Sequence, residues 1–423
     1  MDKRIEELVD YTKATFGLDD YNLLTHQLRR SVNIFNETEY ILGMEWLPPH
    51  AQEREEDGSN PEGTASIDID IHTRQFKSVI FVGGKSYANG VQLQQHVSKH
   101  DIIKGLERRT GLTYGEQFQL VKEEKGEYRF QECIDGVKVS PSGFLEIKFD
   151  KDGNLTLFSI DGHFPPQDKV KKESFSLTQE EVEPLAKQQL KLIEFPSHEQ
   201  ERLIPVYGME EIFVTNDAQS TIPFEFIAER RSYLQIDKTL EWQTPIDQPF
   251  ESTNIDLQEK VDVEQVFQRE PHPDTFPITK TEQEQCITAV ENFLRQELPN
   301  DTGKWVLKTL HRNQGYILAT IKHTKPDNRV FQRKLQVFLD AESLHVLNYM
   351  DNKFLLDMYQ GFKEPEKITL SKEGAYDKIK SYLEITPVYV YDFERHQYLL
   401  CGKLDCPYGV HAVSGEVVLL DEL

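Results

Sequence analysis

The chain alternates between two patterns of apolar and polar positions. A helical spacing of apolar residues appears five times, and each time it is followed by stretches of strict alternation, which is typical of β-strands. The first helical stretch is residues 2–16, whose apolar residues lie on one helical face before Gly17. The five predicted helices begin near residues 2, 98, 178, 281 and 371.

Capping signals mark where several of these helices start. Ser98 is followed three residues later by Asp101, and Thr178 is followed at the same distance by Glu181. In this arrangement the hydroxyl and the acid each accept a backbone N–H of the first helical turn. The same spacing in Thr281-Glu282-Gln283-Glu284 predicts a third capping box there, and Ser371 is the expected start of the last helix.

A short sequence motif recurs between predicted strands along the chain. It is clearest in Val410–Val417, where two strands rich in Val and Leu flank a tight turn. We interpret it as a hairpin turn in which a side chain accepts backbone N–H groups. His411 stands where the other copies have Asp, which predicts a weaker turn bond at that copy. The further copies are Phe338–Val346, Ile69–Phe76, Phe149–Leu155 and Ile236–Trp242, the last two a residue shorter.

The alternation of one helix with several antiparallel strands predicts an α+β fold built of tandem units, each with one helix packed on a small antiparallel sheet. Because one short helix on a few strands makes a thin core, we expect neighbouring sheets to join at their edges. The expected boundaries are 1–90, 91–170, 171–250, a linker at 251–277, 278–362 and a short unit at 363–423.

Composition narrows the possible partners and compartment. The formal charge of −24 over 423 residues disfavours nucleic acid and anionic membranes, because the mean field of the protein repels them. Four cysteines in so long a chain favour a reducing compartment. The N-terminal residues form no apolar signal segment, and no stretch has the length of a membrane span. We therefore expect a cytoplasmic protein, or a secreted one if a leader has been removed.

Candidate chemistry is sparse, and each candidate has a simpler structural interpretation. His96 and His100 are four residues apart, as two metal ligands on a helix would be, but Ser98 between them is the expected N-cap. We therefore favour solvated histidines. Cys401 and Cys406 with His411 form a cluster that fits neither a zinc motif nor a known catalytic dyad. Buried thiols are favoured for this cluster, and a redox pair or a metal site stays open.

Cys133 and Cys286 read as core residues of a strand and a helix. Gly83-Gly84-Lys85-Ser86 lacks the glycine that a phosphate-binding loop needs, since Val79 holds that place. Asp150-Lys151-Asp152-Gly153-Asn154 resembles the start of a calcium loop, but Asp161 stands where a bidentate Glu is required. We therefore predict ordinary loops at both places, with no metal and no cofactor.

The recurring string of helix, strands and Asp-containing turn resembles the PepSY domain. The segment Tyr128–Val139 with Leu145–Asp161 is similar to the propeptide form of that domain, and Asp405–Val417 resembles the closing motif of the YcdB/YcdC-type repeat proteins of bacilli. Two departures are His411 at the Asp position and Leu344 at the position of the turn glycine. The resemblance implies no catalytic residues and a binding, inhibitory or chaperone-like role.

We therefore expect a protein- or peptide-binding or regulatory protein with an unknown protein partner, and no enzyme. Docking on exposed strand edges would be its physical means. Two alternatives stay open. One is an enzyme, either a hydrolase or thiol-dependent, with a site between units and His96, His100, Cys401 or Cys406 as candidates. The other is a structural or assembly protein.

Overall fold

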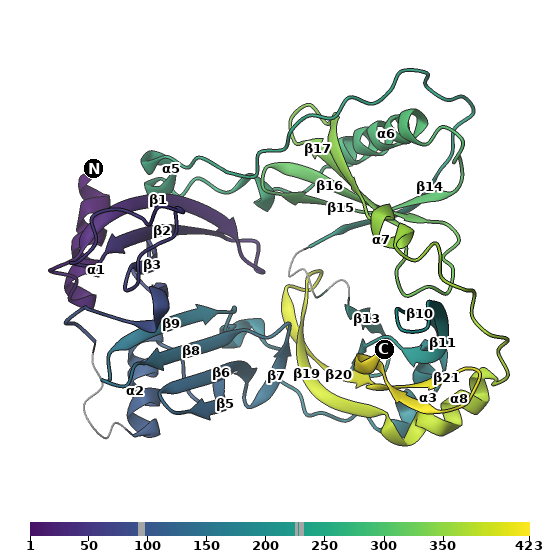
Figure 1. The fold of residues 1–423 in the computed structure, drawn as a ribbon, viewed down its shortest axis with the longest axis horizontal. Helices are drawn as coiled ribbons and strands as arrows, with labels where there is room; N and C mark the ends of the chain where they lie inside the picture. The colour runs from purple at the N-terminus through teal and green to yellow at the C-terminus, as the bar shows by residue number, and fades with distance from the viewer. Residues whose placement is uncertain (92–97, 225–226, 228–231) are drawn as a thin grey trace. The chain divides into compact units, whose positions relative to one another are not determined.

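The computed structural model describes residues 1–91, 98–224, 227 and 232–423 and has an α+β fold (Figure 1). The chain forms two compact units, neither of which is a continuous stretch of sequence. The first unit is made of Met1–Lys172, Gln258–His272 and Val388–Leu399. The second is made of Glu173–Leu257, Pro273–Pro387 and Leu400–Leu423. The expected repeat boundaries within these units remain a prediction.

The first unit contains two successive copies of a helix followed by antiparallel strands. The first copy consists of α1 (Lys3–Phe16), β1 (Asn22–Val32), β2 (Thr38–Leu47), β3 (Ala65–Asp70) and β4 (Phe76–Phe81). The second consists of α2 (Lys99–Thr110), β5 (Phe118–Glu124), β6 (Glu127–Ile134), β7 (Val137–Ser140), β8 (Phe144–Phe149) and β9 (Leu155–Asp161). The strands follow the order β1-β2-β3-β4-β9-β8-β6, with β5 also on β6. The two copies therefore share one sheet, joined at β4 and β9, as expected for neighbouring repeats.

Local chemistry explains where the helices of the first unit begin and end. At the start of α1 the carboxylate of Asp2 accepts the N–H of Arg4 at 2.9 Å, and Gly17 ends the helix in the left-handed region at φ 62°. Ser98 and Asp101 form the predicted capping box of α2. The apolar faces of both helices enter one hydrophobic core with the strands of both copies. Joining the sheets therefore gives two thin repeats a single thick core.

Distant segments complete the first unit. Strand β19 (Glu384–Asp392) pairs in parallel with β7, with Val388 opposite Lys138. The stretch expected as a linker, 251–277, contains a short helix, α5 (Val263–Phe267). Its Val266 is fully buried in the core of the first unit.

The second unit contains a five-stranded sheet, a four-stranded sheet and a strand pair next to β20. The five-stranded sheet consists of β14 (Leu234–Leu240), β15 (Trp305–Asn313), β16 (Tyr316–His323), β17 (Lys334–Asp340) and β18 (Val346–Asp351), in that order. The four-stranded sheet consists of β10 (Leu190–Ser197), β11 (Arg202–Met209), β21 (Tyr408–His411) and β22 (Val417–Leu419). The remaining strands are β12 (Ile212–Thr215) and β13 (Thr221–Pro223), with β12 on β20 (Gln397–Asp405).

Each sheet of the second unit buries one face under helices. The long helix α6 (Lys280–Glu297) lies against the five-stranded sheet (Figure 1). Its buried residues in the core of that sheet are Cys286, Val290, Phe293 and Leu294. Helices α3 (Gln179–Gln189) and α8 (Lys372–Ile379) cover the four-stranded sheet, and a short helix α7 (Lys353–Asp357) follows β18. Thr178 caps α3 and Ser371 caps α8, as predicted.

The capping box predicted at Thr281 is wrong by two residues. The N-cap of α6 is Thr279, whose hydroxyl accepts the N–H of Glu282 at 3.3 Å, while Glu282 accepts the N–H of Thr279 at 2.7 Å. Both threonines have a glutamate three residues later, so the local pattern is ambiguous. Arg312 decides between them, because it binds the Glu282 carboxylate at 2.6 Å from the neighbouring strand.

The recurring turn is a shared hydrogen-bonding device. In the first copy Asp70 accepts the N–H groups of His72 and Thr73 at 3.0 and 2.7 Å. In the copy between β17 and β18, Asp340 does the same with Glu342 and Ser343 at 3.2 and 2.7 Å. The following residue takes the left-handed region in each, at φ 56° for Arg74 and 59° for Leu344. The turn therefore depends on its acceptor rather than on a glycine.

His411 keeps its copy of the turn but with longer bonds, as the sequence predicts. Its ring Nδ1 accepts the N–H groups of Val413 and Ser414, both at 3.2 Å, and so replaces the carboxylate of the other copies. The backbone closes as elsewhere, with the N–H of Gly415 donating to the carbonyl of His411 at 2.8 Å. An imidazole that accepts through Nδ1 is unprotonated at that nitrogen.

The proposed copy at Ile236–Trp242 is not a turn. These residues lie largely within β14, where the pairing with β15 shifts between Gln235 and Lys238. Asp237, at φ 48°, lies in this β-bulge, and its carboxylate binds Lys308 across the sheet. A single Asp between two apolar stretches fits a bulge as well as a short turn, which explains the wrong prediction.

Among the residues that the structure describes, no helix combines the length and the apolar composition that a membrane crossing needs.

The turn acceptor gives a testable pH dependence. Hydrogen bonds from Ser343 hold the pKa of Asp340 below its ordinary value, so its contribution to stability is complete above pH about 4 and is lost as the pH falls through the lowered pKa. We expect Asp340→Asn to lower the free energy of unfolding by about 1 kcal/mol at pH 7. The difference from the unsubstituted protein should shrink below pH 4. Urea unfolding followed by tryptophan fluorescence measures this, since Trp305 lies in the same core.

Glu342→Gln, at an exposed neighbour in the same turn, serves as the control and should leave the unfolding midpoint unchanged at every pH. Equal effects of the two substitutions would contradict the role given to Asp340.

Candidate functional site

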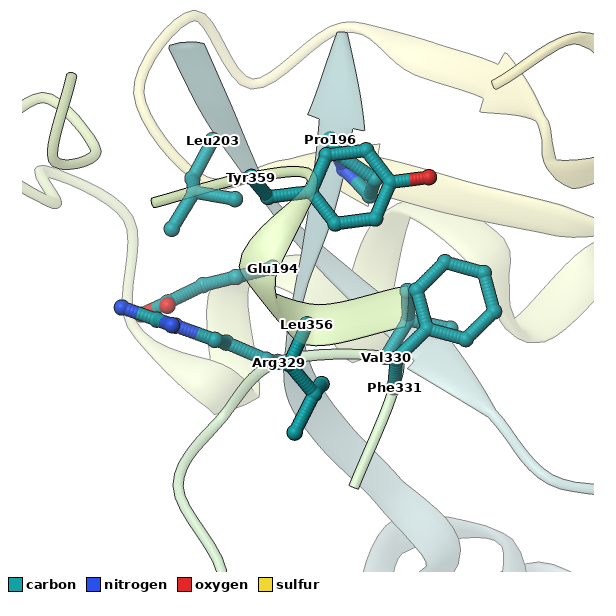
Figure 2. Close-up of a pocket in the computed structure, with 8 residues that line it drawn as sticks. All are labelled: Glu194, Pro196, Leu203, Arg329, Val330, Phe331, Leu356 and Tyr359. Atoms are coloured by element: carbon teal, nitrogen blue, oxygen red, sulfur yellow. The ribbon is translucent and has the colours of Figure 1, made fainter. Parts of the chain in front are cut away.

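An apolar groove lies beside the edge of the four-stranded sheet in the second unit. It encloses about 240 Å³, including space open to solvent. Its lining comes from β10 and β11, from the connection between β16 and β17, and from α7 and the residues after it (Figure 2). The lining residues are Glu194, Pro196, Leu203, Arg329, Val330, Phe331, Leu356 and Tyr359. We call this site the β10 groove.

The backbone edge of β10 is already closed at the groove. Glu194 donates its N–H to the carbonyl of Asn328 at 2.7 Å, and its carbonyl accepts the N–H of Val330 at 3.0 Å. Two residues along, Pro196 occupies the next outward-facing position and has no N–H to offer. A partner strand therefore has no free donor at either position, and the groove presents side chains rather than a backbone edge.

Aromatic rings form one wall of the groove. The rings of Phe331 and Tyr359 stack with centroids 5.9 Å apart and planes 1° from parallel. Tyr359 also meets Phe362 edge-on at 5.3 Å, and the His198 ring lies within 5.6 Å of both. Although it is stacked, the Phe331 side chain is 42% exposed. An apolar ring held at the surface beside a cavity is typical of a binding site.

The charged groups of the groove favour a net negative local field. Burial raises the pKa of Glu194, and the nearby carboxylates of Asp327 and Glu364 raise it further. The hydrogen bond with Asn328 and the positive charge of Arg329 lower the pKa of Glu194. Glu194 and Arg329 lie on the same side of the groove in Figure 2. The apolar lining therefore has a polar end at which a basic group would be favoured.

The histidine pair of the sequence does not form a described site. His96 lies outside the described residues. His100 is exposed in the first turn of α2, beside the N-cap Ser98.

The cysteines are buried and form no disulfide, as favoured from the sequence. At most 1% of the surface of each is exposed: Cys133, Cys286, Cys401 and Cys406. Burial raises the pKa of Cys133 and Cys406, and it raises the pKa of Cys286 to about 11. The Cys406 thiol donates to the carbonyl of Tyr408 at 3.3 Å. A thiolate nucleophile is therefore disfavoured at these positions.

The remaining motifs are loops. Val82–Gly84 is a short 3₁₀ turn after β4, and Lys85 binds the Glu62 carboxylate at 2.7 Å. Asp150 accepts the N–H groups of Asp152 and Asn154 at 2.9 and 2.8 Å, so its carboxylate serves the turn. Within the described residues no group of His, Cys, Asp and Glu is arranged to hold a metal ion.

A buried carboxylate that the sequence did not single out is Glu132. Its side chain accepts the N–H of Gly143 at 2.9 Å and that of Phe164 at 2.7 Å, and the residue is fully buried. Because it accepts both of these N–H groups, Glu132 links β6 to the residue before β8 and to the segment after β9. Its role is structural.

The β10 groove was missed from the sequence because its residues come from positions 194 to 359. One local signal was present. Val330 and Phe331 lie in the connection between β16 and β17, and Leu356 and Tyr359 follow β18. Apolar residues in loops, outside both periodic patterns, mark surface sites.

Comparisons with known proteins give no family for the chain. No family model matches, and no curated protein matches. Among solved structures, the chain is similar to the Bacillus megaterium YpeB C-terminal domain, at 11% sequence identity and a TM-score of 0.22, over 82% of this chain and 96% of that chain. A TM-score this low carries no argument about fold or function, so the PepSY resemblance remains a proposal.

Burial of the cysteines gives a prediction about thiol reactivity. We expect fewer than about one thiol per chain to react with Ellman's reagent within minutes at pH 8, because the reagent needs an accessible thiolate. All four should react once the chain is unfolded in guanidinium. Cys406→Ala should lower the unfolded count by one and leave the native rate unchanged. If a thiol of the native protein reacted rapidly and Cys406→Ala abolished that reaction, the result would support a thiol-dependent enzyme.

Proposed function

We propose that the protein is a non-enzymatic binding protein that takes an apolar side chain of a protein or peptide partner into the β10 groove. The observation that carries the proposal is the groove itself, in which the exposed Phe331 is held against Tyr359 beside the buried Leu203. A shallow apolar groove with a preformed, stacked aromatic wall lets a partner side chain pack against it at little conformational cost.

The mode of binding follows from the closed backbone edge. Strand addition is the usual way in which a sheet edge recruits a peptide. At β10 the hydrogen bonds to Asn328 and Val330 and the missing donor of Pro196 disfavour it. Recognition at this groove therefore depends on the side chain that enters it, and the partner backbone stays outside.

The groove also suggests the chemistry of the partner. Its cavity suits an aliphatic or aromatic side chain, and the carboxylates around Glu194 favour a lysine or arginine next to it. The chain as a whole carries a formal charge of −24, which attracts basic segments over longer distances. We therefore propose a partner segment with one large apolar residue flanked by basic residues.

A non-enzymatic role is proposed because the eight lining residues provide one carboxyl group and one guanidinium group. A carboxyl group with a raised pKa can serve as a general acid. Within this lining, however, Glu194 has no second carboxylate, thiol, imidazole or serine hydroxyl to work with.

The groove is tested by substitution of its exposed ring. Peptides selected from a random library on the full chain serve as the probe, and titration calorimetry measures their affinity. We expect Phe331→Ala to weaken binding by about tenfold or more, since it removes one wall of the cavity. Affinity should also fall as salt is raised, because the basic flank is screened.

Phe276→Ala is the matched control, because Phe276 is also an exposed phenylalanine of the second unit and is 55% exposed. It should leave the affinity unchanged. Selected peptides that lack the predicted apolar and basic pattern, or that bind both variants equally well, would contradict the proposal.

A further inference from the structure

The way in which the two copies of the first unit join provides a template for a second interface. Strands β4 and β9, each the last strand of its copy, pair antiparallel. The paired residues are Ser78 with Ser159, Val79 with Phe158, and Ile80 with Leu157.

The central pair of this junction joins equivalent positions. Val79 lies opposite Ile67, three residues before Asp70 of its own turn. Phe158 lies opposite Ile147, which is also three residues before its turn aspartate, Asp150. The two copies are therefore related by a local pseudo-twofold axis that passes between Val79 and Phe158. Such a pairing is the isologous contact that two identical subunits make.

In the five-stranded sheet of the second unit, β18 occupies the position that β4 and β9 occupy in the first unit: it is the strand that follows the Asp-containing turn. Tyr349 of β18 lies opposite Val337, three residues before the turn aspartate Asp340. Tyr349 is thus the counterpart of the central residues of the first junction. In the described part of the chain, β18 is the last strand of its sheet and has no strand beyond it.

Among the described residues, the outer edge of β18 is bonded to its own chain only around Thr253, whose carbonyl also accepts the side-chain amide of Asn348 at 2.9 Å. The N–H of Asn352 donates inward to Lys334 at 3.3 Å, so by the strand period of two Leu347 and Tyr349 face outward. The carbonyl of Leu347 accepts the N–H of Thr253 at 2.7 Å. The N–H of Tyr349 is held by the side chain of its neighbour Asn348, also at 2.7 Å.

Apolar side chains beside this edge are unusually exposed. Met350 at the end of β18 is 54% exposed, and Phe354 and Met358 of the next turn are 66% and 58% exposed. The last two are four residues apart and so lie on one side of the α7 segment. In the last repeat the equivalent strand, β22, has three residues and runs into a 3₁₀ turn, which makes it a poorer template.

We propose that β18 pairs antiparallel with β18 of a second copy of this chain, with Tyr349 on the twofold axis. The register of β4 and β9 then applies directly. Asn348 lies opposite Met350 of the second copy, and two sheets become one, as they do in the first unit. Thr253 leaves Leu347 when the second strand arrives, so the segment around Thr253 competes with dimer formation.

Sedimentation velocity of the full chain over a range of concentrations tests the interface. We expect a reversible dimer. Asn348→Lys combined with Met350→Lys places like charges opposite each other and should abolish it. Gln235→Lys combined with Thr239→Lys introduces the same charges at exposed positions of β14, the opposite edge of the same sheet, and should leave the dimer intact. A protein that stays monomeric, or a dimer that survives the first pair of substitutions, would overturn the proposal.

Two further variants test the geometry. Thr253→Pro removes the N–H that occupies Leu347 and should lower the dimer dissociation constant by about fivefold. Asn348→Cys combined with Met350→Cys should give a covalent dimer under mild oxidation, since the two positions face each other across the axis. Gln235→Cys should give none, and the native thiols are buried. Cross-linking through Gln235→Cys alone, or a dimer weakened by Thr253→Pro, would contradict the register.

Discussion

The unsatisfied backbone at the edge of a sheet is the constraint on which this architecture depends. Each sheet has edge strands whose outward N–H and C=O groups need partners. In the first unit β4 and β9 satisfy each other. At β10 a three-residue stretch around Arg329 and the outward Pro196 close the edge. At β18, within the described residues, the edge is closed only by the side-chain amide of Asn348 and by two hydrogen bonds to Thr253. The edge of β10 is closed and leaves a groove for side chains, whereas the edge of β18 can still accept another strand.

The shared sheet also explains how such small repeats are stable. A single helix such as α1 covers only part of one face of four strands. When two copies join, both helices pack against the same continuous sheet, and their apolar residues form one cluster. Hydrophobic stabilisation grows with the share of surface buried, so the joined pair gains more than two separate repeats would.

The sequence predicts what is local and misses what depends on distant residues. The helix starts at Ser98, Thr178 and Ser371 were correct, because the signal lies within four residues: a capping box at the first two, and a hydroxyl that accepts the N–H of Gly374 at the third. The start at Thr279 was misplaced, since its choice over Thr281 depends on Arg312, a residue of the next strand.

The candidate site shows the same division. The burial of Cys133 and Cys286 follows from their local strand and helix patterns. The β10 groove does not, because its walls are assembled from four separate segments. The weaker turn bond at His411 was predicted from the identity of the residue, and its ring nitrogen accepts both N–H groups at 3.2 Å, longer than the 2.7 Å bonds that Asp70 and Asp340 accept.

The first unit takes its last strand from near the end of the chain, and this sets a limit on how the protein is made. Most proteins fold from the N-terminus as they leave the ribosome. Here β7 has no parallel neighbour until the strand that contains Val388 has been synthesised. Phe35 likewise lacks its ring contacts until Tyr391 and Tyr398 have been added to the chain. The N-terminal half therefore cannot be completed until the other unit has largely been synthesised. A product truncated before Val388 would leave the outer side of β7 without its parallel neighbour.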